Sequence, residues 1–371
     1  MENPFIVTGK VKPEFFCDRR EESKRIVSCL TGGENMVLMA PRRIGKSKLI
    51  DFCWNQNAIK DHYLTFAIDI LRTSSIQEFT YALGKAVFEK AAHRSERMLR
   101  MVVKTLKSIN GNFGYDPINN MPTFSLSLGD LTSPQYTLEE IFKCLKQADL
   151  PCLVAIDEFQ QICYYPEKNM EAVLRTHIQN CNNAHFIFSG SERHIIDEMF
   201  TDRARPFYNS ADIMNLSAIP LDKYTPFVHE LLGRYNKSTT DEVVSHVYEL
   251  FKGNTYYLQK VFHGAFNSTA EGHAVTMETV DQVINSLLLD SDRKFSETLS
   301  RLTLPQKELL YAIADEGTAR QMTSSKFIKK HQLRSASSVQ AAVKKLLEYH
   351  IVSREQDSYY VDDELMQLWL K

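Results

Sequence analysis

One segment constrains the fold of this chain more than any other: residues 40–47, with the sequence Ala-Pro-Arg-Arg-Ile-Gly-Lys-Ser. It follows an apolar run at 35–39 and precedes a helical pattern at 46–56. It matches the phosphate-binding pattern G-x-x-x-x-G-K-[ST] at every fixed position except the first, where Ala40 replaces glycine. A loop of this kind joins a buried strand to a helix, so the segment predicts an α/β fold with a parallel sheet.

The chemistry of phosphate binding explains the spacing. Backbone N–H groups of the loop and of the helix N-terminus surround the phosphates, and Lys46 reaches the terminal ones. Ser47 offers a hydroxyl ligand to Mg²⁺, and Ala40 is tolerated if its backbone is extended. The residues expected to contact the nucleotide are Pro41, Arg42, Arg43, Ile44, Gly45, Lys46, Ser47 and Lys48.

A second segment supplies acidic partners for this loop. The apolar run at 152–156 leads directly into Asp157 and Glu158, and a buried acid without a partner is costly. We expect Asp157 to contact the magnesium shell and Glu158 to polarise the attacking water as general base. The alternative is that the pair only starts a loop or caps a helix. No G-x-G-x-x-G pattern follows a strand, which disfavours a dinucleotide site.

The distribution of apolar runs and helical patterns divides the chain into domains. A length of 371 residues indicates two or three domains. Short apolar runs alternate with helical patterns up to about residue 220, and an irregular stretch at 110–136 is expected to carry a short exposed hairpin. The predicted domains are an α/β core at 1–220, a helical domain at 221–300, and three helices with a hairpin at 301–371, the order of a winged helix-turn-helix. The strand candidates are 35–39, 63–70, 152–156, 185–189 and 213–216.

Composition limits the classes that remain. The chain has 44 basic and 46 acidic residues, which excludes a uniformly basic nucleic-acid coat but not a local basic patch. The N-terminus lacks the regions of a signal peptide, and no run of about 18 apolar residues occurs, so we expect a cytoplasmic protein without membrane contact. The seven cysteines form no C-x-x-C pair and are predicted to be buried, reduced thiols.

Four segments together resemble a known family, the archaeal-type ATPases of the STAND branch of AAA-like P-loop NTPases. They are Phe-Phe-Cys-Asp-Arg at 15–19, the loop at 40–47, Ile-Asp-Glu-Phe-Gln at 156–160 and Phe-Ser-Gly-Ser at 188–191. The resemblance spans nearly the whole chain. It implies a P-loop NTPase sheet of strand order 5-1-4-3-2, followed by a helical lid and a winged helix, with ATP and Mg²⁺ as ligands.

The resemblance also assigns roles to single residues. It places Phe16, Asp18 and Arg19 beside the adenine, and Ser189 at the polar sensor position that orients water, although Ser189 would equally suit a plain strand end. Arg205 stands where relatives often carry an arginine before the fifth strand. Since arginine is the preferred transition-state cation, Arg193 and Arg203 are further candidates.

Two more positions follow from strand ends and from the family pattern. Asp69 ends the second strand and is a candidate near the phosphates. The segment Gly-Asn-Thr-Tyr-Tyr at 253–257 resembles a helix start in the family's lid, with Thr255 where proline is common.

The C-terminal region departs from the neutral average. Between residues 318 and 347 there are seven basic residues and no acidic one, which suits phosphate contacts by a helix-turn-helix, whereas Ser335, Ser337, Ser338 and Gln340 suit base contacts. Winged helices also bind proteins, so double-stranded DNA and a protein partner both remain open. The candidate nucleic-acid residues are Lys326, Lys329, Lys330, Arg334, Ser337, Lys344 and Lys345. A second basic cluster contains Arg94, Arg97, Arg100, Lys104 and Lys107.

These patterns predict an ATPase with slow turnover, in which the state of the bound ATP or ADP repositions the winged helix. One alternative is a DNA-binding regulator or mobile-element accessory protein that hardly hydrolyses ATP. Another is a scaffold whose terminal domain binds protein. The sequence leaves the pathway and the oligomeric state open.

Overall fold

The computed structural model describes residues 2–9, 11–108, 112–116, 121–125, 131 and 133–371. The chain forms two compact units, Arg19–Ser217 and a second that joins the residues before Arg19 to Ala218–Lys371. We expected residues 1–220 to form one domain, but the N-terminal segment packs with the helical unit. Phe5 is fully buried and stacks on Phe262 with ring centroids 5.5 Å apart, while its backbone carbonyl bonds to His263.

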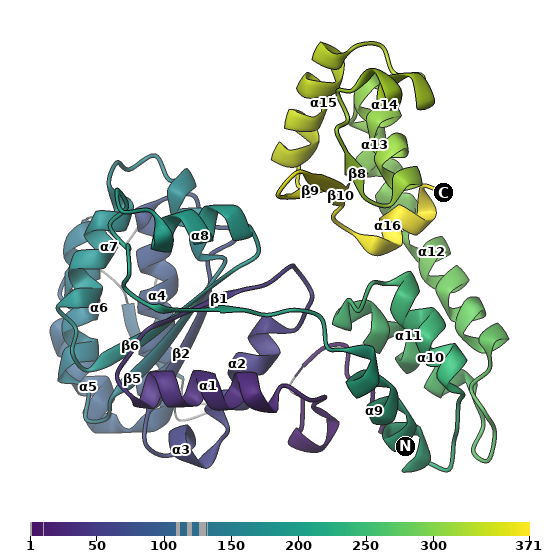
Figure 1. The fold of residues 1–371 in the computed structure, drawn as a ribbon. Coiled ribbons are helices and arrows are strands. Elements are labelled where there is room, and N and C mark those ends of the chain that lie inside the picture. Colours follow the sequence, from purple (N-terminus) through teal and green to yellow (C-terminus); the bar gives the residue numbers. More distant parts are fainter. Residues whose placement is uncertain (1, 10, 109–111, 117–120, 126–130, 132) are drawn as a thin grey trace. The chain divides into compact units, whose positions relative to one another are not determined.

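The first unit is built on a parallel sheet of order β2-β5-β6-β1-β7. All five predicted strands are present, and numbering them along the chain gives the order 5-1-4-3-2, so this prediction is confirmed. Helices lie on both sides of the sheet (Figure 1). The strands are β1 (Met36–Met39), β2 (Leu64–Asp69), β5 (Cys152–Asp157), β6 (Ala184–Gly190) and β7 (Asp212–Asn215).

Burial explains why these runs form strands. Every residue of β1 is buried, and β5 is buried up to its terminal aspartate, as is usual where helices cover both faces of a parallel sheet. β2, at the edge, alternates between buried and more exposed residues. The helices of this unit are α1 (Arg20–Thr31), α2 (Lys46–Trp54), α3 (Asn57–Lys60), α4 (Ile76–Arg94), α5 (Glu96–Thr105), α6 (Pro134–Gln147), α7 (Met170–Gln179) and α8 (Arg193–Thr201), with a 3-10 helix η3 (Phe159–Tyr164).

The predicted hairpin is present in the irregular stretch. β3 (Asn112–Asp116) pairs antiparallel with β4 (Met121–Ser125), while residues 126–128 of the alternating run lie outside the described part of the chain.

The second unit begins with helices. Residues 221–300, which were predicted to be helical, contain α9, α10, α11 and α12. A proline at position 226 inside α9 weakens its helical pattern. The bounds are η1 (Pro13–Phe15), α9 (Leu221–Gly233), α10 (Asp241–Leu250), α11 (Thr255–Ser268) and α12 (Met277–Ser300).

The C-terminal part has the predicted order of three helices and a hairpin. Ser335 caps α15 by accepting a hydrogen bond from the backbone N–H of Ser338. The sheet has a third strand, β8, that is too short to predict, and a final helix that Asp363 caps. The elements are α13 (Leu304–Glu316), β8 (Ala319–Arg320), α14 (Ser325–Lys330), α15 (Ala336–Glu348), β9 (Val352–Glu355), β10 (Ser358–Val361) and α16 (Glu364–Trp369).

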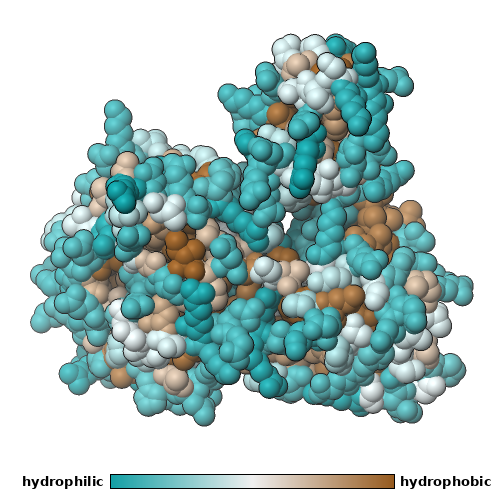
Figure 2. All heavy atoms as spheres, in the orientation of Figure 1, coloured by the Kyte–Doolittle hydropathy of each residue, from teal (hydrophilic) through white to brown (hydrophobic). Residues whose placement is uncertain are grey.

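The cysteines and the helices test two predictions, one on reduced thiols and one on membrane contact. Five of the seven cysteines are buried free thiols as predicted, but Cys29 is half-buried and Cys163 is exposed. Among the described residues, no helix combines the length and the apolar character that a bilayer crossing requires. The face seen in Figure 2 is mostly hydrophilic, with small separate hydrophobic patches.

A polar network joins α16 to α11 within the second unit. The Asn254 amide donates to Glu364 Oε2 at 2.8 Å, and the Tyr257 hydroxyl donates to Asp363 Oδ1. The pKa of Glu364 is raised to about 7, chiefly by burial and to a smaller extent by the charges of Asp363 and Asp362, while the hydrogen bond from Asn254 acts in the opposite direction. Lys252 is the basic residue close to this carboxyl group.

This raised pKa predicts a pH-dependent stability. Below about pH 4.5 Glu364 is protonated in both the folded and the unfolded state, and above about pH 7 it is ionised in both, so stability falls across this window. When the pH is raised from 5 to 8, we expect the melting temperature of Glu364→Gln to fall less than that of the parent protein. The difference should be about 2–4 °C for each kcal/mol by which ionisation of Glu364 lowers the free energy of unfolding. Thermal melts at both pH values measure it, with the exposed Glu278→Gln as control. Identical pH dependence of parent and Glu364→Gln contradicts the prediction.

Candidate nucleotide site

Strand register brings the three predicted segments to one edge of the sheet. β6 lies between β1 and β5, and Met39 pairs with Gly190 while Ile156 pairs with Phe188. The strands are parallel, so their carboxyl ends meet, and ligands of such sheets bind beyond those ends. The loop after β1, the two acids after β5 and the turn after β6 therefore form one candidate site.

The backbone of the loop explains its glycine. Gly45 has φ +96° and forms the N-cap of α2, a conformation that an L-residue adopts only with strain. Arg43 also has a left-handed φ of +64°, whereas Ala40 is not among the described residues with positive φ. Alanine therefore fits the first motif position without backbone strain, as expected.

Lys46 is held inside the loop. Its side chain is only 6% exposed, and Nζ donates to the carbonyls of Ala40 at 3.2 Å and Pro41 at 3.4 Å. Burial lowers the pKa of Lys46, although Glu158 and Asp157 act in the opposite direction. Incoming phosphate charge would compensate the cost of burying this ammonium group.

Asp157 contacts the two predicted hydroxyl groups. Ser47 Oγ donates to its Oδ2 at 2.9 Å, and Ser189 Oγ donates to its Oδ1 at 2.7 Å. Mg²⁺ favours oxygen ligands and takes few from the protein when phosphates and water supply the rest. The Ser47 hydroxyl and the Asp157 carboxylate fit that ion, so this part of the predicted site is geometrically consistent.

Glu158 is held by residues that sequence reasoning missed. Its Oε2 accepts from the Gln160 amide at 2.7 Å, from Ser191 Oγ at 2.6 Å and from the Ser191 backbone N–H at 3.2 Å. Both partners stand within the sequence segments at 156–160 and 188–191, which was the available signal. Their meeting required the register of β5 against β6.

The arginine candidates differ in their surroundings. Arg205 forms ion pairs with Glu171 at 2.8 Å and Glu198 at 3.5 Å, on α7 and α8, so its guanidinium is engaged by acids in this structure. Arg203 is exposed, and Arg193 is the first residue of α8. The structure therefore gives Arg205 a packing role that the sequence did not predict.

The adenine candidates lie in different units. Phe16 and Asp18 belong to the unit of α9–α16, and Arg19 belongs to that of the sheet. Arg19 is buried and donates to Glu22 and to the carbonyl of Ser217. Asp69 lies opposite Asp157 in the register of β2 and β5, where it accepts from the N–H of Leu71. Asp69 therefore lies beside Asp157 at the end of β5.

The basic stretch of the winged helix is partly neutralised by acids just outside it. Lys330 pairs with Glu316 and Lys345 pairs with Glu348. Among the described residues of this stretch, Lys326, Lys329, Arg334 and Lys344 are exposed without an ion pair. In the second basic cluster, Arg100 pairs with Glu96 on α5.

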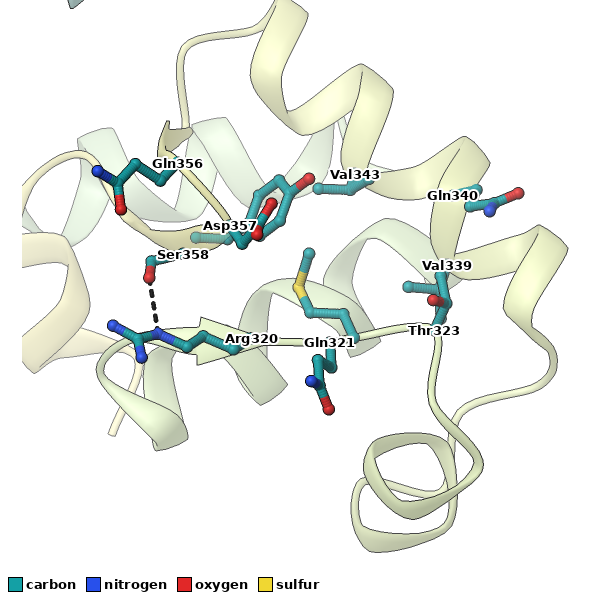
Figure 3. A pocket seen from close by; sticks show the side chains of 11 residues that line it. Arg320, Gln321, Thr323, Val339, Gln340, Val343, Gln356, Asp357 and Ser358 are labelled. Atoms are coloured by element: carbon teal, nitrogen blue, oxygen red, sulfur yellow. Dashed lines mark hydrogen bonds between the residues drawn. The ribbon is translucent and has the colours of Figure 1, made fainter.

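A groove of about 560 Å³ separates α15 from the wing formed by β9 and β10. Figure 3 shows Gln340 and Val343 of α15 on one side and Gln356 and Asp357 of the wing on the other. Arg320 of β8 and Ser358 also line this groove, and Arg320 Nε donates to Ser358 Oγ at 2.8 Å.

Comparison with known proteins supports the fold. A search of curated proteins finds no match. The model of a probable winged helix domain matches residues 293–371. Three solved structures are similar over 99% of this chain: a Walker-type ATPase of Pyrococcus abyssi (18% identity, TM-score 0.67, 99% of that chain), the ORC2 protein of Aeropyrum pernix with ADPNP and ADP (12%, 0.58, 96%) and the ORC1 protein of Aeropyrum pernix with DNA (13%, 0.56, 96%).

The chain has the fold of archaeal Walker-type P-loop ATPases and ends in a winged helix. The fold that the resemblance implied is thus confirmed. The three-domain division stays a prediction, and the winged-helix match begins inside α12.

Arg205 provides a test of the packing role. Burial raises the pKa of Glu171, and Arg205 is the main group that opposes this rise. We expect Arg205→Ala to leave that acid without its partner and to destabilise the sheet unit by about 1–2 kcal/mol. Urea unfolding measures the change, and the exposed Arg203→Ala is the matched control. An Arg205→Ala protein as stable as Arg203→Ala would contradict this role.

Proposed function

We propose that this protein binds and hydrolyses Mg-ATP, and that the bound nucleotide controls the placement of the winged helix. The observation that carries the proposal is the meeting of the phosphate-binding loop with Asp157 and Glu158 at the carboxyl edge of one parallel sheet. The likeness of the fold to a Walker-type ATPase and to an ORC2 protein solved with ADPNP and ADP supports it.

In the proposed reaction each group has a separate task. Lys46 and the N–H groups of the loop hold the phosphates, and Ser47 and Asp157 would hold Mg²⁺, which would neutralise charge on the β- and γ-phosphates. Glu158 takes a proton from the attacking water, and Ser189 orients that water or the γ-phosphate. An arginine finger stays unassigned, and membership of the STAND branch and a cytoplasmic location stay predictions.

Two substitutions separate binding from hydrolysis. We expect Lys46→Ala to abolish binding of a fluorescent ATP analogue, because the phosphates lose their buried cation. We expect Glu158→Gln to keep binding while slowing phosphate release by about 10²-fold or more, since the amide is not a base. Fluorescence titration and a steady-state phosphate assay measure these effects.

The exposed Lys60→Ala on α3 is the matched control for loss of a lysine. If Lys46→Ala binds the analogue as well as Lys60→Ala does, the proposed site is wrong. If Glu158→Gln hydrolyses ATP at the parent rate, Glu158 is not the base.

A second candidate function is binding of duplex DNA by the winged helix. It is favoured by the exposed lysines on α14 and α15 that form no ion pair among the described residues, and a similar structure, the ORC1 protein of Aeropyrum pernix, was solved with DNA. In this hypothesis Lys326, Lys329 and Lys344 contact phosphates, while Ser337 and Gln340 face bases. The alternative of a protein partner remains, and an oligomer is compatible with both.

The ion pairs offer a matched comparison. We expect Lys329→Ala with Lys344→Ala to weaken DNA binding more than Lys330→Ala with Lys345→Ala, because the second pair is already engaged by glutamates. Each lost phosphate contact should also lower the slope of log affinity against log salt by about one. Fluorescence anisotropy over a salt series measures both. Equal effects, or no binding by the parent, would favour a protein partner.

A further inference from the structure

Gln160 and Ser191 surround the carboxylate of Glu158. We propose that they are positioning residues for hydrolysis, which fix Glu158 so that Oε1 takes the proton of the attacking water while Oε2 is held by the protein. This inference rests on the proposed ATPase function and deepens it.

The backbone of Glu158 is strained. Its φ of +57° is left-handed, a conformation that is unfavourable for a non-glycine residue. Such strain persists only where the surroundings hold it in place. Here the side chain is 8% exposed, and three N–H or O–H groups donate to a single carboxylate oxygen. The position of Glu158 is therefore fixed from both ends, by its turn and by its carboxylate.

Gly190 leaves space for the Gln160 side chain. A Cβ at this position would lie 2.2 Å from Gln160 Oε1 and 2.7 Å from Ile196 Cδ1, which is closer than real contacts. Gln160 is fully buried, and its Oε1 has no hydrogen-bond partner. The hydrogen bond that its Nε2 donates therefore determines the orientation of the amide group. That nitrogen donates to Glu158. The glycine after Ser189 thus leaves the room that lets Gln160 reach the carboxylate.

Ser191 links the Glu158 carboxylate to the phosphate-binding loop. A serine hydroxyl donates one hydrogen bond and accepts up to two. Ser191 Oγ donates to Glu158 and accepts from Arg42 Nε at 3.4 Å. One hydroxyl therefore touches both the base and an arginine of the loop. The turn at 189–191 supports both acids, with Ser189 on Asp157 and Ser191 on Glu158.

Steady-state kinetics test the proposal. We expect Ser191→Ala and Gln160→Leu each to lower kcat about tenfold or more, because small misplacements of a reacting group have effects of this size. The KM for ATP and the affinity for a fluorescent ATP analogue should stay within about twofold, since neither residue holds the phosphates. Ser191→Thr keeps the hydroxyl and should restore most of the rate. Thr201→Ala, an exposed hydroxyl on α8, is the matched control.

A readout without turnover accompanies the kinetics. In the nucleotide-free protein, Glu158→Ala should speed hydrogen exchange of the Ser191 amide, because that N–H loses its acceptor.

Each contrary result has its own meaning. Ser191→Ala with parental or raised kcat, a loss of rate equal to that of Thr201→Ala, or a Ser191→Thr protein as slow as Ser191→Ala would overturn the positioning role. Unchanged exchange at Ser191 in Glu158→Ala would overturn the contact itself. If the parent neither binds nor hydrolyses ATP, the proposed function fails, and this result is read from the parent alone.

Discussion

The parallel pairing of β6 with β1 on one side and β5 on the other is the constraint on which the site depends. It aligns three strand ends, so that the loop after Met39, the acids after Ile156 and the turn after Phe188 share one edge. Such register is strongly specified because every one of these strands is buried.

Placing the half-buried Asp157 and the buried Glu158 at that edge creates a demand for hydrogen-bond donors, and residues 189–191 supply most of them. Asp157 receives hydroxyl hydrogens from Ser47 and Ser189, and Glu158 receives its donors from Gln160 and Ser191. A buried acid without such partners would be costly. The hydrogen bonds that compensate the cost of removing these carboxylates from water are thus also those that orient the groups needed for phosphate chemistry.

In the second unit, acids outside the basic stretch neutralise part of its charge. The stretch from 318 to 347 has no acidic residue, yet Glu316 and Glu348 flank it and pair with Lys330 and Lys345. Charge counted along the sequence therefore overstates the charge available to a partner. At the far end of this unit, α16 reaches back to α11 through Glu364 and Asn254, a contact between residues 110 positions apart.

The sequence by itself determined the five strands, the phosphate-binding loop, the winged-helix order and, through a family resemblance, the strand order, since apolar runs and turn residues are local signals. It did not reveal that Gln160 and Ser191 meet on Glu158, that Arg205 pairs with acids, or that the residues before Arg19 join the helical unit. These facts depend on which distant segments pack together. Only the tertiary structure decides them, because hydrogen bonds and ion pairs across the fold leave no periodic trace along the chain.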